Sequence, residues 1–296
     1  MTRKHYDRKL SADLLSSHNQ LNGATVIMHI DTLLNSVKQQ AELNINDIKL
    51  SVSSGWEQGR TLYGGISASL VYQAMREAVD SEKVMRSLST NFIGPIEAGS
   101  DFSIIVEVLR EGKNVTQVVG RVLQDNKVAL MSQASFGIPR QSKVNVSDPL
   151  QHKMDYPEKP NFMPQIPKVT PKFLGHFDLS KNKGGWPFTG TKESAVHGWM
   201  RFKEQPSVFS DAHLIALIDI WPPTVLQILC SPAMASTMSW NLEFIHPHQK
   251  VSGVDWFAYQ AQTRQAADGY AHTEANIWDK NGTLVAISRQ VVAVFA

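Results

Sequence analysis

The sequence predicts an α+β fold made of two repeats, in each of which an antiparallel sheet wraps one central helix. Three observations predict it. Two segments share an ordered set of short motifs, each segment contains one apolar helix followed by about four alternating strands, and a proline-rich stretch separates the two. A duplicated unit accounts for the shared order, and a helix followed by antiparallel strands is typical of α+β domains.

The helix of the first repeat is predicted over about residues 65–79. Its apolar residues recur at the spacings of a wide helical face, namely Ile66, Leu70, Val71, Ala74, Met75 and Ala78. Small residues fill its first turns at 67–69, so a sheet can approach closely there. Two glycines, Gly64 and Gly65, stand at its start. The equivalent helix of the second repeat is predicted over about residues 211–221.

The strands follow each helix and alternate with a period of two residues. In the first repeat they are predicted within residues 87–100, 102–111, 114–124 and 127–138. In the second repeat they are predicted within residues 237–250, 254–265, 269–279 and 283–295. Turn-forming residues separate them, as in the segment Asp279 to Gly282.

Short motifs align the two repeats. Phe92-Ile93-Gly94-Pro95 matches Phe244-Ile245-His246-Pro247, and Gln133 takes the place of Gln290. Seven prolines between Pro139 and Pro171 forbid regular structure and indicate an extended surface linker. The predicted domains are therefore residues 1–140, which include an N-terminal extension, the linker 141–172, and residues 173–296. In the extension, residues 31–43 predict an amphipathic helix capped by Asp31.

The composition is that of an ordinary globular protein. Of 296 residues, 42% are hydrophobic and 19% are charged, which is enough chain to bury a large core. The 29 basic and 27 acidic residues leave a net charge of +2, and no long run has one sign. We therefore expect no nucleic-acid partner.

Cysteine usage and hydropathy indicate the compartment. Cys230 is the only cysteine, so an internal disulfide is impossible and a reducing compartment is the natural expectation. The first twenty residues are polar, unlike a signal peptide, and no stretch of about 18 apolar residues occurs. We expect a cytoplasmic protein with no membrane partner. We also expect no cofactor and no metal, since His246 and His248 lack a cysteine or carboxylate at ligand spacing.

Three polar residues of the second repeat stand out. Asp219 has no charged neighbour three or four residues away, so it is either a partly buried carboxylate or a solvated helix-end residue. Gln290 lies among apolar residues and needs hydrogen-bond partners, which backbone groups or Asp219 can supply. Thr237 begins a strand whose alternation places it opposite to Met238 and Trp240, and a polar strand face alone accounts for it.

The glycines at the first helix have two interpretations. The first turn of a helix offers unpaired N–H groups, and glycine lets another group approach the backbone. Gly64 and Gly65 can therefore bind a substrate oxygen that gains negative charge, an effect of about 3–4 kcal/mol per donor. They can equally serve only to make the strand-to-helix turn.

In these motifs the sequence resembles the acyl-CoA thioesterase II (TesB-like) family, whose members fold as a double hotdog. The resemblance covers roughly residues 50–140 and 190–296. Its matching pieces in the first half are residues 63–65, 86–95, 106–114 and 134–136. In the second half they are Asp219, Thr237 and residues 285–290. The chain departs from the family pattern at Ser239-Trp240, where the family has Asp-His, and at Val291-Val292, where it has Glu-Gly.

The resemblance implies an enzyme that hydrolyses acyl-CoA to a free acid and CoA. It implies that Asp219, Thr237 and Gln290 hold the attacking water, that Gly64 and Gly65 bind substrate, and that the protein is a homo-oligomer. The acyl chain then needs an apolar tunnel between the hotdogs. Trp221, Met238 and Trp240 are candidates for its lining, and core packing accounts for these residues equally well. A non-catalytic acyl-thioester binding protein on the same fold is the alternative. A dehydratase or hydratase on the same fold is the third possibility. It ranks below the other two because neither His197 nor His213 stands at a matching place in a repeat.

Overall fold

The computed structural model describes residues 28–296 except 53–54, 148, 167–168 and 250. The polar first twenty residues, on which the expectation of no signal peptide rests, lie outside them. The elements are α2 (Ile30–Asn44), β1 (Ile48–Ser51), β2 (Glu57–Gln58), β3 (Thr61–Leu62), α3 (Gly64–Glu77), β4 (Val84–Phe92), β5 (Asp101–Glu111), β6 (Val115–Gln124), β7 (Lys127–Gly137), the 3₁₀ helix η1 (Lys172–His176), β8 (Phe177–Lys183), β9 (Ala195–Phe202), α4 (Asp211–Ile218), the 3₁₀ helix η2 (Thr224–Gln227), β10 (Met234–Phe244), β11 (Phe257–Ala267), β12 (Tyr270–Trp278) and β13 (Leu284–Phe295).

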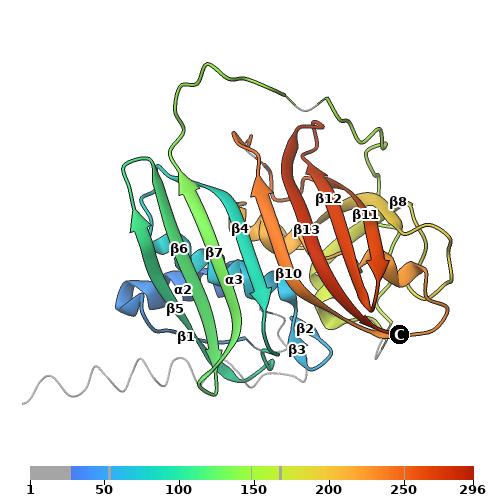
Figure 1. The fold of residues 1–296 in the computed structure, drawn as a ribbon, viewed down its shortest axis with the longest axis horizontal. Helices are drawn as coiled ribbons and strands as arrows, with labels where there is room; N and C mark the ends of the chain where they lie inside the picture. Colours follow the sequence, from blue (N-terminus) through green and yellow to red (C-terminus); the bar gives the residue numbers. More distant parts are fainter. Residues whose placement is uncertain (1–27, 53–54, 148, 167–168, 250) are drawn as a thin grey trace, which may run out of the picture.

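In the described part of the chain, 11 strands form one antiparallel sheet in the order β1-β5-β6-β7-β4-β10-β13-β12-β11-β9-β8. The strands before the linker occupy one end of the sheet and those after it occupy the other (Figure 1). The two sets meet where β4 pairs with β10, with Leu88 opposite Leu242. The two strands that follow the equivalent helices therefore join the halves into one continuous sheet.

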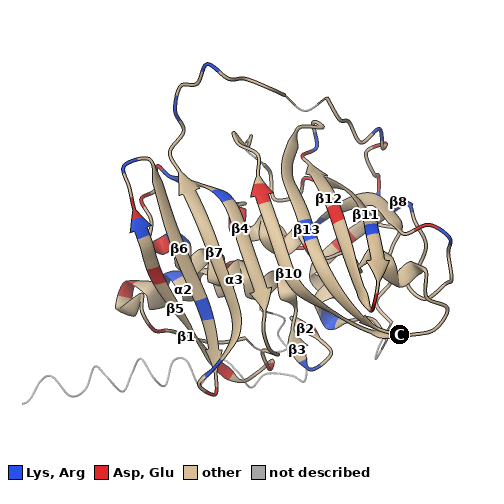
Figure 2. Ribbon diagram, in the orientation of Figure 1, with Lys and Arg blue, Asp and Glu red and all other residues tan. Residues whose placement is uncertain are grey.

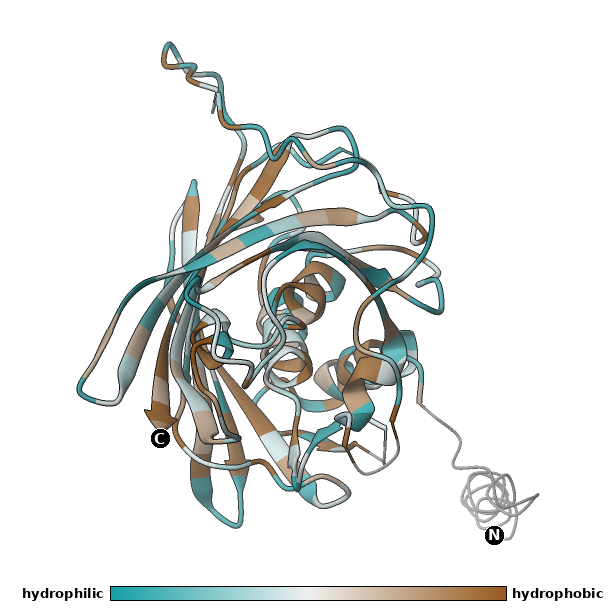
Figure 3. Ribbon diagram, turned by 90° about the vertical axis from the view of Figure 1, so that its right-hand side faces the viewer, coloured by the Kyte–Doolittle hydropathy of each residue, from teal (hydrophilic) through white to brown (hydrophobic). Residues whose placement is uncertain are grey.

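Each half of the sheet curls around one helix, as the sequence predicts. Figure 3 looks along the molecule and shows the helices enclosed by the sheet. Every residue of α3 from Gly65 to Met75 is buried, and so is every residue of α4 from Ala212 to Ile218. The two helices also contact each other, since Ser69 Oγ donates a hydrogen bond of 2.7 Å to the Ala212 carbonyl. The small residues of α3 therefore permit a close approach of α4 as well as of the sheet.

Two predicted helix boundaries differ from the structure. Helix α4 ends at Ile218, not at residue 221, and Asp219 is its C-cap residue. Pro222 and Pro223 follow shortly after this end, and proline cannot continue a helix. Helix α2 is capped by His29, whose side chain accepts from the Asp31 N–H at 3.2 Å, so the prediction of Asp31 as the cap was wrong.

Strands β1, β8 and β9 were not predicted, because they lie outside the repeated motifs. The linker was expected on the surface, and part of it is held against β8. The N–H groups of Asn161 and Phe162 donate to the Leu179 carbonyl at 2.9 and 3.2 Å. In Figure 1 the linker leaves the end of β7, arches past the ends of the central strands and descends near β8.

Charged residues are scattered over the strands and loops, with both signs interspersed (Figure 2). Among the described residues, none of the helices is both long and apolar enough to cross a membrane.

Close packing of α3 on β6 depends on a glycine. A methyl group at Gly120 would lie 2.6 Å from Val71 Cγ1 and 3.1 Å from Met75 Cγ. We predict that Gly120→Ala lowers the free energy of unfolding by about 1–3 kcal/mol, because the buried helix must shift. Urea denaturation measures this. In the control Gly175→Ala, the nearest atom to the new methyl is Gln165 Oε1 at 3.9 Å. Equal stability of the two variants would contradict the prediction.

Candidate active site

The start of α3 and the end of α4 meet between the two halves of the molecule. Gly64 and Gly65 form the first turn of α3, and Asp219 caps the end of α4. A glycine pair is needed here because the neighbouring groups leave no room for side chains. A Cβ at Gly64 would lie 2.9 Å from Asp219 Oδ2, and one at Gly65 would lie 2.5 Å from the Tyr63 hydroxyl oxygen.

The Asp219 carboxylate accepts hydrogen bonds from both halves of the chain. Gln290 Nε2 donates to Asp219 Oδ1 at 2.8 Å. The backbone N–H of Gly65 donates to the same carboxylate from the first turn of α3. Burial raises the pKa of Asp219 from 3.8 to about 7, while these two hydrogen bonds oppose the rise. The carboxyl group therefore changes charge near neutral pH.

Thr237 and Gln290 lie side by side on β10 and β13. Thr237 Oγ1 donates to Gln290 Oε1 at 3.4 Å, and the amide nitrogen of Gln290 is directed to Asp219. A relay of hydrogen bonds therefore runs from Thr237 through Gln290 to Asp219, and it fixes the orientation of the Gln290 amide. The structure brings all three predicted polar residues together.

The predicted direction of Thr237 was wrong. Alternation along the strand placed Thr237 on the face opposite to Trp240. A β-bulge lies between Thr237 and Ser239, where the register with β13 shifts by one residue. The extra residue turns Thr237 to the inner face, on which Gln290 lies opposite Trp240. No pattern in this strand marks the bulge.

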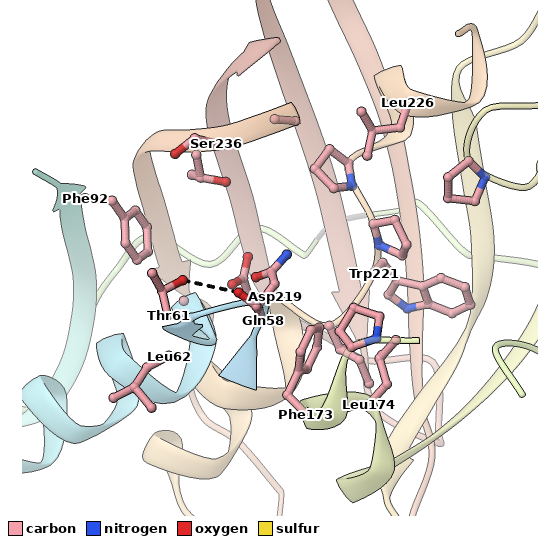
Figure 4. A pocket seen from close by; sticks show the side chains of 18 of the residues that line it. Gln58, Thr61, Leu62, Phe92, Phe173, Leu174, Asp219, Trp221, Leu226 and Ser236 are labelled. Atoms are coloured by element: carbon pink, nitrogen blue, oxygen red, sulfur yellow. Dashed lines mark hydrogen bonds between the residues drawn. The ribbon is translucent and has the colours of Figure 1, made fainter. Parts of the chain in front are cut away.

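Asp219 opens onto a large cavity of about 1020 Å³. Figure 4 shows its side chain among those of Phe92, Phe173, Leu174 and Trp221. The polar residues of the lining are Gln58, Thr61, Ser67, Asp219, Ser236, Thr237 and Gln290, besides Thr170 of the linker. The rest of the lining is mainly apolar and aromatic.

Of the three residues predicted to line an acyl tunnel, Trp221 lines the cavity. Met238 and Trp240 do not line it. Met238 lies at the bulge with 46% of its surface exposed. Trp240 is buried in the core and donates from Nε1 to Ser288 Oγ at 2.9 Å.

Sequence reasoning missed the part that the linker takes in this cavity. Met163, Pro164 and Ile166 line it, as do the later linker residues Val169 to Pro171. Prolines were interpreted as marks of an exposed connection. They also line an apolar pocket well, because their rings are rigid and the segment needs few backbone hydrogen bonds. Trp186 to Phe188, from the loop between β8 and β9, complete this wall.

Among the described residues, the first repeat has no equivalent of Gln290. Leu88 lies opposite Ala134 in the first half, and Trp240 lies opposite Gln290 in the second. Leu88 and Trp240 occupy equivalent places, because each stands four residues before the shared Phe-Ile motif. Ala134 thus takes the place of Gln290, and the predicted match of Gln133 to Gln290 is off by one residue. Gln133 lies on the outer face, where its Nε2 donates to Gln117 Oε1 at 3.2 Å.

The His-Pro-His segment does not form a metal site within the described residues, where no group of three His, Cys, Asp or Glu side chains has a suitable arrangement. The rings of His246 and His248 stack with centroids 4.1 Å apart. Their Nε2 atoms lie 2.8 Å from the Met85 carbonyl and 3.0 Å from the Val285 carbonyl.

Comparison with solved structures shows the fold class. A hot dog fold protein of unknown function from Alicyclobacillus acidocaldarius is 21% identical, with a TM-score of 0.73 over 85% of this chain and 94% of that chain. An acyl-CoA thioesterase II from Mycobacterium marinum is 17% identical, with a TM-score of 0.67 over 89% of this chain and 97% of that chain. The architecture is therefore the double hotdog that the sequence predicts.

Sequence comparison shows the family. The model of the acyl-CoA thioesterase N-terminal domain matches residues 52–137, and that of the C-terminal domain matches residues 155–294. Acyl-CoA thioesterase 2 of Haemophilus influenzae is 20% identical over 252 residues, which make up 78% of this chain and 86% of that protein. The chain belongs to the acyl-CoA thioesterase family and is a thioester hydrolase.

The raised pKa of Asp219 makes stability depend on pH. The folded chain holds the Asp219 proton up to about pH 7, whereas an unfolded chain loses it near 3.8. Stability is therefore predicted to fall as the pH rises from about 4 to about 7, by at most about 4 kcal/mol from this group. Urea denaturation at several pH values, with Asp219→Asn as the reference that lacks the carboxyl group, measures the difference. Parallel pH profiles of the two proteins would contradict the prediction.

Proposed function

We propose that this chain hydrolyses acyl-CoA by direct attack of a water molecule that Asp219, Thr237 and Gln290 hold. The observation that carries the proposal is a carboxylate with a pKa of about 7, which accepts a hydrogen bond of 2.8 Å from Gln290 Nε2 and lines a mainly apolar cavity. A general base works best when its pKa lies near the working pH. Asp219 combines that pKa with a fixed orientation.

The reaction needs one base and no covalent intermediate. The water oxygen attacks the thioester carbonyl carbon, and its proton passes to the Asp219 carboxylate. The resulting tetrahedral intermediate collapses, the carbon–sulfur bond breaks, and the departing thiolate takes the proton from Asp219. Gln290 keeps the carboxylate in place, and Thr237 keeps the Gln290 amide in its orientation.

The two glycines have different parts in this proposal. Gly65 donates its N–H to Asp219 and so holds the base. Gly64 lines the cavity and occupies the first helical position, where the N–H has no partner within the helix. Its N–H is the donor that we assign to the oxygen of the tetrahedral intermediate, at the positive end of the α3 dipole.

The acyl group occupies the apolar part of the cavity in this proposal. Side chains of both halves surround it, among them Leu62, Phe92, Phe173, Trp221 and Leu226. A volume of about 1020 Å³ is large for a small-molecule site. The apolar walls limit the access of bulk water to the thioester in this proposal, so that the water held at Asp219 is the one that reacts.

The first test removes the base. Asp219→Asn is predicted to lower kcat for acyl-CoA hydrolysis by about 10²–10³-fold in a thiol-release assay, because proton transfer from water loses its acceptor. The control Asp47→Asn, which removes a surface carboxylate paired with Lys49, should retain full activity. In the wild type, kcat should rise through about pH 7 and then level off, as Asp219 loses its proton. Undiminished turnover of Asp219→Asn would remove this residue from the mechanism, and CoA-ester binding without thiol release would favour a binding protein.

The second test displaces the Asp219 carboxylate while residue 219 itself stays an aspartate. A methyl group at Gly64 would lie 2.9 Å from Asp219 Oδ2 and 3.2 Å from Phe92 Cε1. Gly64→Ala is therefore predicted to lower kcat by about tenfold or more, since small displacements of a catalytic group cost much rate. Thiol release and the melting temperature are measured together, with Gly175→Ala as the control. Full activity in a folded Gly64→Ala variant would contradict both the placement of the base and the part assigned to Gly64.

A further inference from the structure

Tyr63, the residue before the two glycines, makes an unusual contact across the two halves. Its hydroxyl group donates a hydrogen bond of 2.8 Å to the backbone carbonyl of Ala216, in the last turn of α4. Carbonyls in the last turn of a helix have no partner within the helix. Tyr63 thus caps the C-terminal end of α4 with a side chain from the start of α3.

The ring of Tyr63 has two close neighbours. It stacks on Phe173 with centroids 4.0 Å apart and an angle of 4° between the planes. It also lies against Gly65, where an added Cβ would be 2.5 Å from the hydroxyl oxygen. The side chain is 1% exposed, so no water competes for its hydroxyl group. Burial and the nearby Asp219 charge raise the pKa of Tyr63 well above 10, so the hydroxyl group stays a donor.

Two hydrogen bonds therefore join the same two helix turns. One runs from Tyr63 to Ala216, and the other from the Gly65 N–H to the Asp219 carboxylate. The donors are two residues apart at the start of α3, and the acceptors are three residues apart at the end of α4.

We propose that Tyr63 is a positioning residue for the base, which sets the distance between the Gly65 N–H and the Asp219 carboxylate through its hydrogen bond to Ala216. This inference rests on the proposed function of Asp219. Tyr63 does not touch the reacting atoms in this scheme. It acts through Ala216 and the last turn of α4. Its neighbours Gly64 and Phe173 line the cavity, whereas Tyr63 does not.

The test is Tyr63→Phe, which keeps the ring and its stacking on Phe173 and deletes only the hydroxyl group. We expect kcat to fall about tenfold with little change in KM, because the base is displaced and the pocket is kept. The acid limb of the kcat profile should move to higher pH, because a weaker bond from Gly65 stabilises the carboxylate less. A melting-temperature loss of about 2–6 °C is expected from the unpaired carbonyl.

Tyr72→Phe is the matched control. Tyr72 is also a buried tyrosine of α3 whose hydroxyl group crosses to the other half, where it donates to Asp211 Oδ2 at 3.2 Å. It does not line the cavity. The melting temperature of Tyr72→Phe should therefore fall by a similar amount, while kcat and the pH profile stay unchanged. If Tyr63→Phe behaves in the same way, with a lower melting temperature only, Tyr63 is structural and the inference is wrong.

A second measurement separates this inference from the proposed function. The pKa of Asp219 is read from the pH dependence of unfolding, relative to Asp219→Asn, in chains with Tyr63 or Phe at position 63. This readout needs no turnover. A higher pKa of Asp219 in Tyr63→Phe would support the positioning contact. If Asp219→Asn also kept full activity, the proposal that Asp219 is the general base would be refuted. An unchanged pKa would overturn the positioning contact whatever the kinetics show.

Discussion

The site depends on the close approach of two helix ends that belong to different halves of the chain. The first turn of α3 supplies N–H groups, and the last turn of α4 supplies the Asp219 carboxylate. Gly64 is required because the carboxylate lies against its backbone, and Gly65 because the Tyr63 ring does. The continuous sheet, joined where β4 pairs with β10, connects the two halves that carry these helices.

Burial raises the pKa of the Asp219 carboxylate and also lowers the stability of the fold at neutral pH. Desolvation raises the pKa of Asp219 to about 7, and hydrogen bonds from Gln290 and Gly65 limit the rise. Without those donors the group would stay protonated and could not accept a proton at neutral pH. In open solvent it would be a weak base of ordinary pKa. In the proposed mechanism, this balance of apolar walls and two donors gives Asp219 the pKa that a general base needs, and it lowers the stability of the fold at neutral pH.

The sequence predicted the repeat, the two central helices and the polar residues, because these leave periodic or chemical marks. Asp219 stood out by lacking charged neighbours, and Gln290 by lying among apolar residues. The direction of Thr237 could not be predicted, since the bulge at Met238 shifts the alternation without a signal in the residues themselves. The linker wall was missed because prolines in a pocket and prolines on a surface have the same composition. The link from Tyr63 to Ala216 spans 153 residues and no local pattern encodes it.

Single-turnover hydrolysis in water labelled with ¹⁸O tests most directly whether Asp219 acts on water and not on the acyl carbon. Excess enzyme is mixed with acyl-CoA, and mass spectrometry then follows the label in the released acid and in the peptide that contains Asp219. Direct attack predicts that every acid molecule of the first turnover carries one ¹⁸O atom and that Asp219 carries none. Label in Asp219, with unlabelled acid in the first turnover, would show a covalent anhydride and contradict the account.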